Sequence, residues 1–197
     1  MPGMSEALPK CSDDPRERVL RAAERAFVAS GFHGARMAQI AKEAQMSPGH
    51  IYHYFDSKEH IIAEMIRAHY DEKKTSVERY HDAGEKVVDM MIDNLRTNVT
   101  SNTDPFWSTL MLEIAAEATR KPEIASSIRA MDLELKEKVI SYLKTSVKKD
   151  DLDSRLEVFV ALMQGIGIRN ILNPNLDKEA VILILQEVIE VLFRRPD

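Results

Sequence analysis

Residues 46–58 read Met-Ser-Pro-Gly-His-Ile-Tyr-His-Tyr-Phe-Asp-Ser-Lys, and this stretch decides how the rest of the chain is interpreted. Ser47 is a good helix N-cap, and Pro48 has the fixed φ angle that suits the first position of a helix. Gly49 leaves the start of that helix without a side chain, so its backbone can approach another surface closely. The stretch therefore predicts a very short helix with an open N-terminal end.

The side chains of this short helix divide into two sets. Ile51 and Phe55 lie four residues apart on one face, which suits them to a core. The other set contains hydrogen-bond donors, namely His50, Tyr52, His53 and Tyr54. Because such donors bind phosphate groups, this arrangement is suited to docking on duplex DNA.

The preceding sequence supplies two further helices. Residues 14–17, Asp-Pro-Arg-Glu, form a capping box with proline at the first helical position, and Gly31 ends the helix that they begin. A second short helix is predicted over about residues 37–44, only a few residues before Ser47. Two short helices joined by so tight a turn form a helix-turn-helix, whose second helix enters the major groove.

These residues together resemble the TetR family of transcriptional regulators, over roughly residues 15–62. The resemblance rests on Gly31-Phe32, Ile40-Ala41-Lys42-Glu43-Ala44, the stretch Ser47-Pro48-Gly49-His50-Ile51-Tyr52-His53-Tyr54-Phe55, and Lys58. It implies an N-terminal helix-turn-helix head, a larger helical ligand-binding body, and a homodimer that binds an operator and a small-molecule effector. The function expected from it is that of a ligand-responsive regulator, most simply a repressor released from a palindromic operator by a hydrophobic or cationic effector.

The resemblance also assigns DNA contacts residue by residue. It gives the base edges to Pro48, Gly49 and His53, gives the phosphates to His50, Tyr52, Tyr54 and Lys58, and adds Arg36, Gln39 and the N-cap Ser47. Three positions depart from the family pattern. Gln45 replaces the usual turn glycine, so either it adopts a left-handed conformation at a cost of about 1 kcal/mol or the turn differs. Ala35-Arg36 replaces a hydroxyl pair, and His50 replaces a small hydroxyl residue.

Composition agrees with an all-α regulator. The chain has 197 residues, 44% of them hydrophobic, with few Gly and Pro and without sustained alternation of period two. Its formal charge of −5 lies entirely in residues 61–197, because residues 1–60 hold equal numbers of basic and acidic residues. A neutral head with clustered donors is compatible with DNA binding.

The sequence contains no sign of export or of a cofactor. The first residues are polar and no apolar run reaches membrane-spanning length, so we expect a cytoplasmic protein with no membrane contact. Cys11 is the only cysteine, so the chain has no internal disulfide. We expect no cofactor and no metal; His50 and His53 have metal-ligand spacing, but nothing nearby completes a site.

The organisation predicted is a flexible arm over residues 1–14, the helix-turn-helix over 15–60, and a ligand-binding and dimerisation domain over 61–197. A long helix from Ser57 to about Tyr80 connects head and body and has His69 and Tyr70 on its apolar side. Further helices are predicted over 88–99, 106–118 and from about 128 to 147.

The last two helices, residues 156–172 and 180–193, are apolar nearly all round. A helix of this kind must be covered on every side, either by the rest of one chain or by a second copy. The resemblance implies that these helices form a four-helix dimer interface. The residues assigned to it are Phe159, Met163, Gly167, Val181, Leu185, Val188 and Leu192.

Methionine and aromatic residues on the body helices are suited to lining an apolar cavity, although ordinary core packing could also use them. The set predicted to bind the ligand is Met65, Met90, Met91, Phe106, Trp107, Met111 and Met131. Glu113 and Glu117, with Asp93, could select a cationic ligand, although paired glutamates on helices are usually solvated. We expect no catalytic residues; the alternative is a helical carrier or enzyme that uses the cavity.

Overall fold

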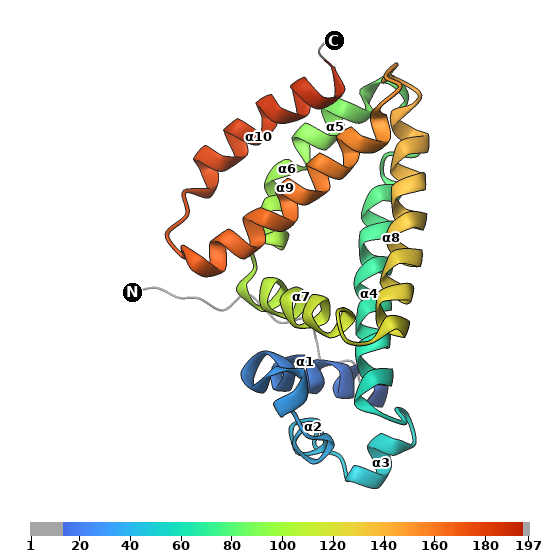
Figure 1. Ribbon diagram of the computed structural model, residues 1–197, viewed down its shortest axis with the longest axis vertical. Helices are drawn as coiled ribbons and strands as arrows, with labels where there is room; N and C mark the ends of the chain where they lie inside the picture. The colour runs from blue at the N-terminus through green and yellow to red at the C-terminus, as the bar shows by residue number, and fades with distance from the viewer. Residues whose placement is uncertain (1–13, 195–197) are drawn as a thin grey trace. The chain divides into compact units, whose positions relative to one another are not determined.

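The computed structural model describes residues 14–194, which form helices and no strand (Figure 1). The helices are α1 (Pro15–Gly34), α2 (Met37–Glu43), α3 (Pro48–Tyr52), α4 (Lys58–Glu78), the 3-10 turn η1 (Gly84–Lys86), α5 (Val87–Asp93), α6 (Leu95–Asn102), α7 (Pro105–Ala118), α8 (Pro122–Leu143), α9 (Leu152–Leu172) and α10 (Lys178–Phe193). The all-α expectation is confirmed. The predicted N-terminal arm and Cys11 lie outside the described residues.

The chain divides into two compact units after Met65, inside α4, rather than after residue 60 as predicted. We call the described residues up to Met65 the head and those from Ile66 onward the body. Apolar residues of α4 are buried on both sides of this division, among them Ile62 and Ile66.

In the head, local signals in the sequence set the helix ends. The Asp14 carboxylate accepts a hydrogen bond from the Arg16 amide at 2.9 Å and caps α1. Gly31, with φ 68°, interrupts α1 near its end, because this backbone conformation is open to glycine. The core behind α2 and α3 consists of fully buried side chains, including Phe27, Ile40 and Phe55.

The turn between α2 and α3 has a glycine-type geometry without a glycine. Gln45 has φ 56°, and among residues 14–194 it is the only non-glycine residue with a positive φ. The Met46 amide donates to the Ala41 carbonyl at 2.9 Å and the Gln45 amide donates to the Lys42 carbonyl at 3.1 Å, the pattern of a Schellman motif. Of the two alternatives for Gln45, the structure therefore has the left-handed conformation.

In the body, α4 and α8 lie side by side and are joined by ion pairs (Figure 1). Lys74 pairs with Glu134, Lys138 pairs with Glu78, and the Tyr142 hydroxyl also donates to Glu78 at 3.0 Å. Such exposed pairs contribute little stability individually.

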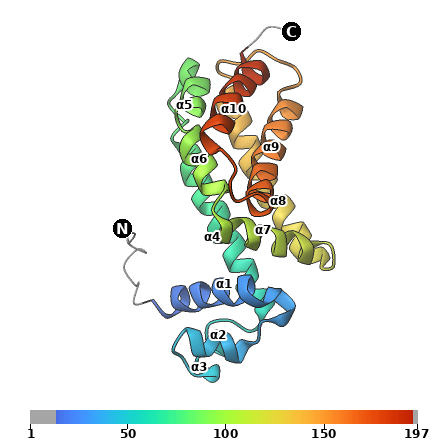
Figure 2. The ribbon, with the colours of Figure 1, turned by 90° about the vertical axis from the view of Figure 1, so that its left-hand side faces the viewer.

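The main core of the body lies among α5, α6, α9, α10 and the C-terminal end of α8 (Figures 1 and 2). Its fully buried side chains include Leu95, Leu143 and Ile189. The single helix predicted over 88–99 is in fact two, because Asn94 ends α5 with its side-chain amide donating to the Met90 carbonyl at 2.8 Å. Asparagine competes for backbone hydrogen bonds in this way, which the apolar spacing alone does not reveal.

Helix α9 approaches the end of α6 very closely. A Cβ atom at Gly167 would lie 2.5 Å from the Asn102 carbonyl oxygen, so no larger residue fits without a backbone shift. One turn further on, the Asn170 side-chain amide donates to the Thr103 carbonyl at 2.8 Å. Gly167 therefore serves packing within one chain, whereas the sequence analysis assigned it to a dimer interface.

Candidate functional site

The N-terminal end of α3 is an open surface. The Ser47 hydroxyl accepts from the His50 amide at 3.2 Å, so the N-cap is formed as predicted. Ser47, Pro48 and Gly49 are exposed, and a Cβ atom at Gly49 would meet no atom within 4 Å. A flat or convex partner can therefore approach the backbone of this helix directly.

Four ring side chains surround that open end. Tyr52 is 51% exposed, and His50 and His53 are exposed as well. Tyr54 is half-buried, with its ring centroid 5.3 Å from that of His50 and 5.2 Å from that of His53. Ile51, by contrast, is fully buried and anchors the helix. The structure therefore brings the rings of His50, His53 and Tyr54 together at this end, and Tyr52 is exposed.

The two remaining predicted DNA contacts lie at α2. Arg36 is the N-cap residue of this helix and is exposed. Gln39 is half-buried and its amide donates to Glu43 at 3.3 Å, which restrains its side chain. Arg36 is thus an exposed cation at the surface, while Gln39 has a partner within its own helix.

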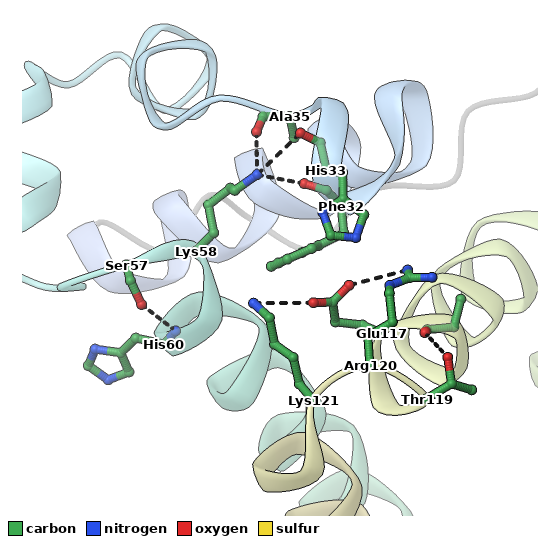
Figure 3. Close-up of polar contacts among 11 residues, drawn as sticks. Phe32, His33, Ala35, Ser57, Lys58, His60, Glu117, Thr119, Arg120 and Lys121 are labelled. Carbon is green, nitrogen blue, oxygen red and sulfur yellow. Dashed lines mark hydrogen bonds and ion pairs between the residues drawn. The ribbon is translucent and has the colours of Figure 1, made fainter.

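Lys58 has a different environment from the one predicted. Its ammonium group donates to the Phe32 carbonyl at 2.7 Å and to the Ala35 carbonyl at 2.8 Å, and it lies 4.8 Å from the centre of the Phe32 ring (Figure 3). These carbonyl groups lie at the C-terminal end of α1, where a cation is favoured by the helix dipole. Lys58 is therefore used to join the starts of α4 and α2 to α1, and the expected phosphate contact is not supported by its geometry.

Arg18 performs a similar task that the sequence analysis did not anticipate. Its guanidinium donates to the Ala44 carbonyl at 2.6 Å and to the Gln45 carbonyl at 3.3 Å. These acceptors are at the C-terminal end of α2, in the turn that leads to α3. Arg18 and Lys58 thus hold the short helices through contacts that do not involve the exposed residues of α3. Those exposed residues are therefore available for binding a partner.

The last two helices of the body have an exposed apolar surface. Its large side chains, which we call the apolar face, are Val158, Leu162, Ile168, Leu172, Leu183, Ile184 and Val191. Gly165 lies in the same stripe of α9, and a Cβ atom there would meet no atom within 4 Å. An exposed apolar face of this kind is typical of a surface that another protein covers.

The residues assigned to the dimer interface lie mostly on the opposite sides of these helices. Met163 and Leu185 are buried in the chain's own core, as is Gly167, and Phe159, Val181 and Leu192 pack partly buried against that core. Val188 is half-buried. A helix that is apolar all round has no polar face from which the sequence could predict its orientation.

The residues predicted to line a ligand cavity are not all brought together. Met65 belongs to the head, and Met91 lies in the main core of the body. Met90, Met111 and Met131 are half-buried. Phe106 and Trp107 do meet, with ring centroids 5.9 Å apart.

Trp107 has a second aromatic partner that sequence reasoning did not include in the site. The His69 ring of α4 lies 4.8 Å from the Trp107 ring, with the two planes inclined by 31°. Burial, assisted by the charge of Lys73, lowers the pKa of His69 to about 4. The position of His69 on the apolar side of a helix, with Lys73 one turn later, was the signal that could have identified it.

The carboxylates considered for a cationic ligand have other roles. Glu117 is fully buried, and its oxygens lie 3.3 Å from Arg120 and 3.2 Å from Lys121 (Figure 3). Its charge is therefore compensated within the chain, whereas Asp93 is exposed. A compensated carboxylate offers little attraction to a cationic ligand.

Among residues 14–194 no helix is long and apolar enough to cross a membrane.

Comparisons with known proteins agree with this division into head and body. The family model described as "Bacterial regulatory proteins, tetR family" matches residues 19–65, and the one described as "BetI-type transcriptional repressor, C-terminal" matches residues 83–194. The regulator UidR of Escherichia coli K12 is 30% identical over 140 residues, which are 70% of this chain and 68% of that protein. The regulator BetI of Stenotrophomonas maltophilia is 32% identical over 138 residues, which are 65% of this chain and 67% of that protein.

Solved structures have the same fold. Salmonella enterica GusR matches with a TM-score of 0.69 and 24% identity, over 95% of this chain and 100% of that one. A TetR transcription regulator from Haloarcula marismortui matches with a TM-score of 0.76 and 17% identity, over 93% of this chain and 100% of that one. The helix-turn-helix head and the helical body define a ligand-responsive, DNA-binding transcriptional regulator. The chain belongs to the TetR family, with a C-terminal region of the BetI type.

Proposed function

We propose that this regulator is a homodimeric repressor whose two heads bind the half-sites of a palindromic operator. The observation that carries the proposal is the open N-terminal end of α3, where Gly49 has free space in front of it and His50, Tyr52 and His53 are exposed. A recognition helix needs this combination of a bare backbone and surrounding donors to enter the major groove.

In this proposal Pro48, Gly49 and His53 face the base edges, while His50, Tyr52 and Tyr54 contact phosphates together with the exposed Arg36. Ser47 and Gln39 remain in the predicted contact set. Lys58 leaves that set, because two backbone carbonyl groups already accept its hydrogen bonds.

The apolar face of α9 and α10 supports the dimer. Large aliphatic side chains there, such as Leu172, Leu183 and Ile184, are more than half exposed in the single chain. A two-fold axis would bury this face against its copy, because a C2 interface uses the same patch on both subunits. Two linked heads then bind a palindrome far more tightly than one.

The effector is proposed to bind in the body beside Phe106 and Trp107 and to change the affinity for DNA through different affinities for two conformations of the dimer. Since the proposed activity is DNA binding, we place the protein in the cytoplasm, with no catalytic residues.

The function is tested by sequencing genomic DNA fragments retained by the purified protein. A palindromic motif in the retained fragments, bound by two chains in sedimentation, is the expected result. Fragments without a shared motif, or a motif bound by one chain, would contradict the proposal. Tyr52→Phe should weaken binding to variants of the motif about equally, because a phosphate contact carries no sequence information.

A further inference from the structure

A half-buried histidine of the body, His69, has a buried ring nitrogen without a hydrogen-bond partner among residues 14–194. His69 is held between its helix and Trp107, and within the described part of the chain its Nε2 atom is buried and makes no hydrogen bond. A buried polar atom without a partner has lost its hydrogen bonds to water and gained none in return, which is unfavourable. A ligand that supplies the missing partner therefore gains binding energy at this position.

The charge that acts on His69 is positive, and it belongs to Lys73. Lys73 lies one turn after His69 on α4, so both side chains leave the helix on the same side. Asp132 of α8 and the adjacent Glu72 favour the charged form of Lys73, but burial outweighs them and lowers its pKa. The ammonium group is thus poorly compensated, and an additional negative charge would stabilise it.

A further donor lies beside His69. The Tyr70 ring is perpendicular to the His69 ring, with centroids 6.1 Å apart. Burial, together with the charge of Asp132, raises the pKa of the Tyr70 hydroxyl to about 12, so it remains protonated. The group facing His69 from α7 is Trp107, which is uncharged and offers an apolar surface.

We propose that His69 and Lys73 bind the carboxylate of an anionic effector whose apolar part packs beside Trp107. The inference rests on the proposed function, because it names the chemistry of the effector of that regulator. It replaces the cationic effector considered from the sequence, since the carboxylate of Glu117 is compensated by Arg120 and Lys121. The carboxylate accepts from the Nε2–H tautomer of His69 and from the Lys73 ammonium group.

The test uses Trp107, the only tryptophan of the chain, as a fluorescent reporter. Phenylacetate and 3-phenylpropanoate are titrated at pH 7 beside their uncharged amides and the cation phenethylamine. Each acid should quench Trp107 saturably and bind about tenfold more tightly than its amide, the effect of one charge-assisted hydrogen bond.

Two variants and a matched control assign the preference to residues. Lys73→Met and His69→Phe should each remove the preference for acid over amide, while changing amide affinity little. The exposed Lys148 lies in the same unit, so Lys148→Met should keep the preference. Circular dichroism verifies that each variant is folded, and a variant that unfolds is replaced by Lys73→Leu or His69→Leu, neither of which supplies a donor.

The proposal is overturned if neither acid quenches Trp107, if amides or phenethylamine bind as tightly as the acids, or if both variants keep the preference for acids. Anisotropy of labelled operator DNA separates this result from the proposed function. Acids that bind as expected but leave DNA affinity unchanged support the anion site and contradict the regulatory role of the body. If phenethylamine quenches Trp107 and releases DNA, the result instead supports the regulatory role of the body and contradicts the anion site.

Discussion

The exposed end of α3 and the apolar face of α9 and α10 are both surfaces without a partner inside one chain, but their chemistry is opposite. At α3 the exposed groups are hydroxyls, imidazoles and bare backbone around Gly49. On the body they are aliphatic side chains such as Leu172 and Leu183. The first surface suits a hydrated polyanion such as DNA, and the second suits another apolar protein surface. The exposure of a surface therefore indicates that a partner binds there, and the chemistry of its side chains indicates the class of that partner.

The two surfaces also differ in how they are supported. Helix α3 has five residues and is held by one buried side chain, Ile51, and by the cations behind it. Helices α9 and α10 are long enough to bury one side in the core and still present another. Mutations at the two surfaces should therefore affect different properties: DNA affinity at α3, and assembly or folding at α9 and α10.

The largest effect is expected from two adjacent residues of α10. Ile184 is 59% exposed and Leu185 is 4% exposed. Ile184→Glu should give a folded monomer whose operator affinity is lower by about a hundredfold or more, because the gain from two linked heads is lost. Leu185→Glu should unfold the chain, because it buries a charge in the core. Sedimentation and circular dichroism distinguish these outcomes, and a folded dimer of the Ile184 variant would exclude the apolar face as the interface.

A smaller effect is expected at α3. Gly49→Leu should lower operator affinity by about 1–3 kcal/mol, comparable to the loss of one base contact, because its side chain would keep the helix away from the groove. Its melting temperature and dimer state should equal those of the wild type, since nothing lies within 4 Å of the new Cβ atom. Gly49→Ala should have a smaller effect in DNA titrations. If the leucine variant binds the operator as tightly as the wild type, α3 does not lie in the DNA interface.

Two cations of the head should behave differently although both were predicted to contact DNA. Arg36→Met should reduce the slope of log affinity against log salt concentration by about one unit per head and leave stability unchanged. Lys58→Met should instead lower the free energy of unfolding by about 1–3 kcal/mol, because two carbonyl oxygens lose their donor. Urea unfolding measures the free energy of unfolding, and salt titrations measure the salt dependence of operator affinity. If Lys58→Met has a reduced salt slope and full stability, Lys58 contacts a phosphate after all.

The smallest effect is expected from pH. Because the pKa of His69 is about 4 in the folded chain and about 6.5 when unfolded, the unfolded chain binds the additional proton between these values. Stability should fall as the pH falls through this window, by about 1 kcal/mol or less in all, because the half-buried ring is partly screened by solvent. His69→Phe should flatten the dependence, whereas the same change at exposed His50 should not. Equal profiles for the two variants would contradict the burial of His69.

The sequence predicted the head well because its signals are local. Asp14 and Ser47 cap their helices with their own side chains, and the proline that follows each of them fixes the first turn. Gly31 interrupts α1 because it adopts a positive φ angle, a conformation that favours glycine. Such features depend on neighbours in the chain, and no knowledge of tertiary packing is needed to recognise them.

The parts that were not predicted depend on contacts between distant residues. The partners of Lys58 are carbonyl groups more than twenty residues away, and backbone groups have no sequence signature. The exposed side of α9 and α10 depends on which face meets α5 and α6, and a helix apolar all round leaves that open. His69 was recognised on an apolar face, but its stacking on Trp107 required the arrangement of α4 and α7.

Arg18 and Lys58 hold the short helices through backbone carbonyl oxygens, which every amino acid supplies. A substitution at an acceptor position such as Ala44 or Gln45 therefore leaves the acceptor in place. The residues at the exposed end of α3 take no part in these contacts. A duplicated gene for this chain could thus change its DNA-facing side chains one at a time while each intermediate still folds. The architecture of the head favours the divergence of operator specificity among descendants that share one scaffold.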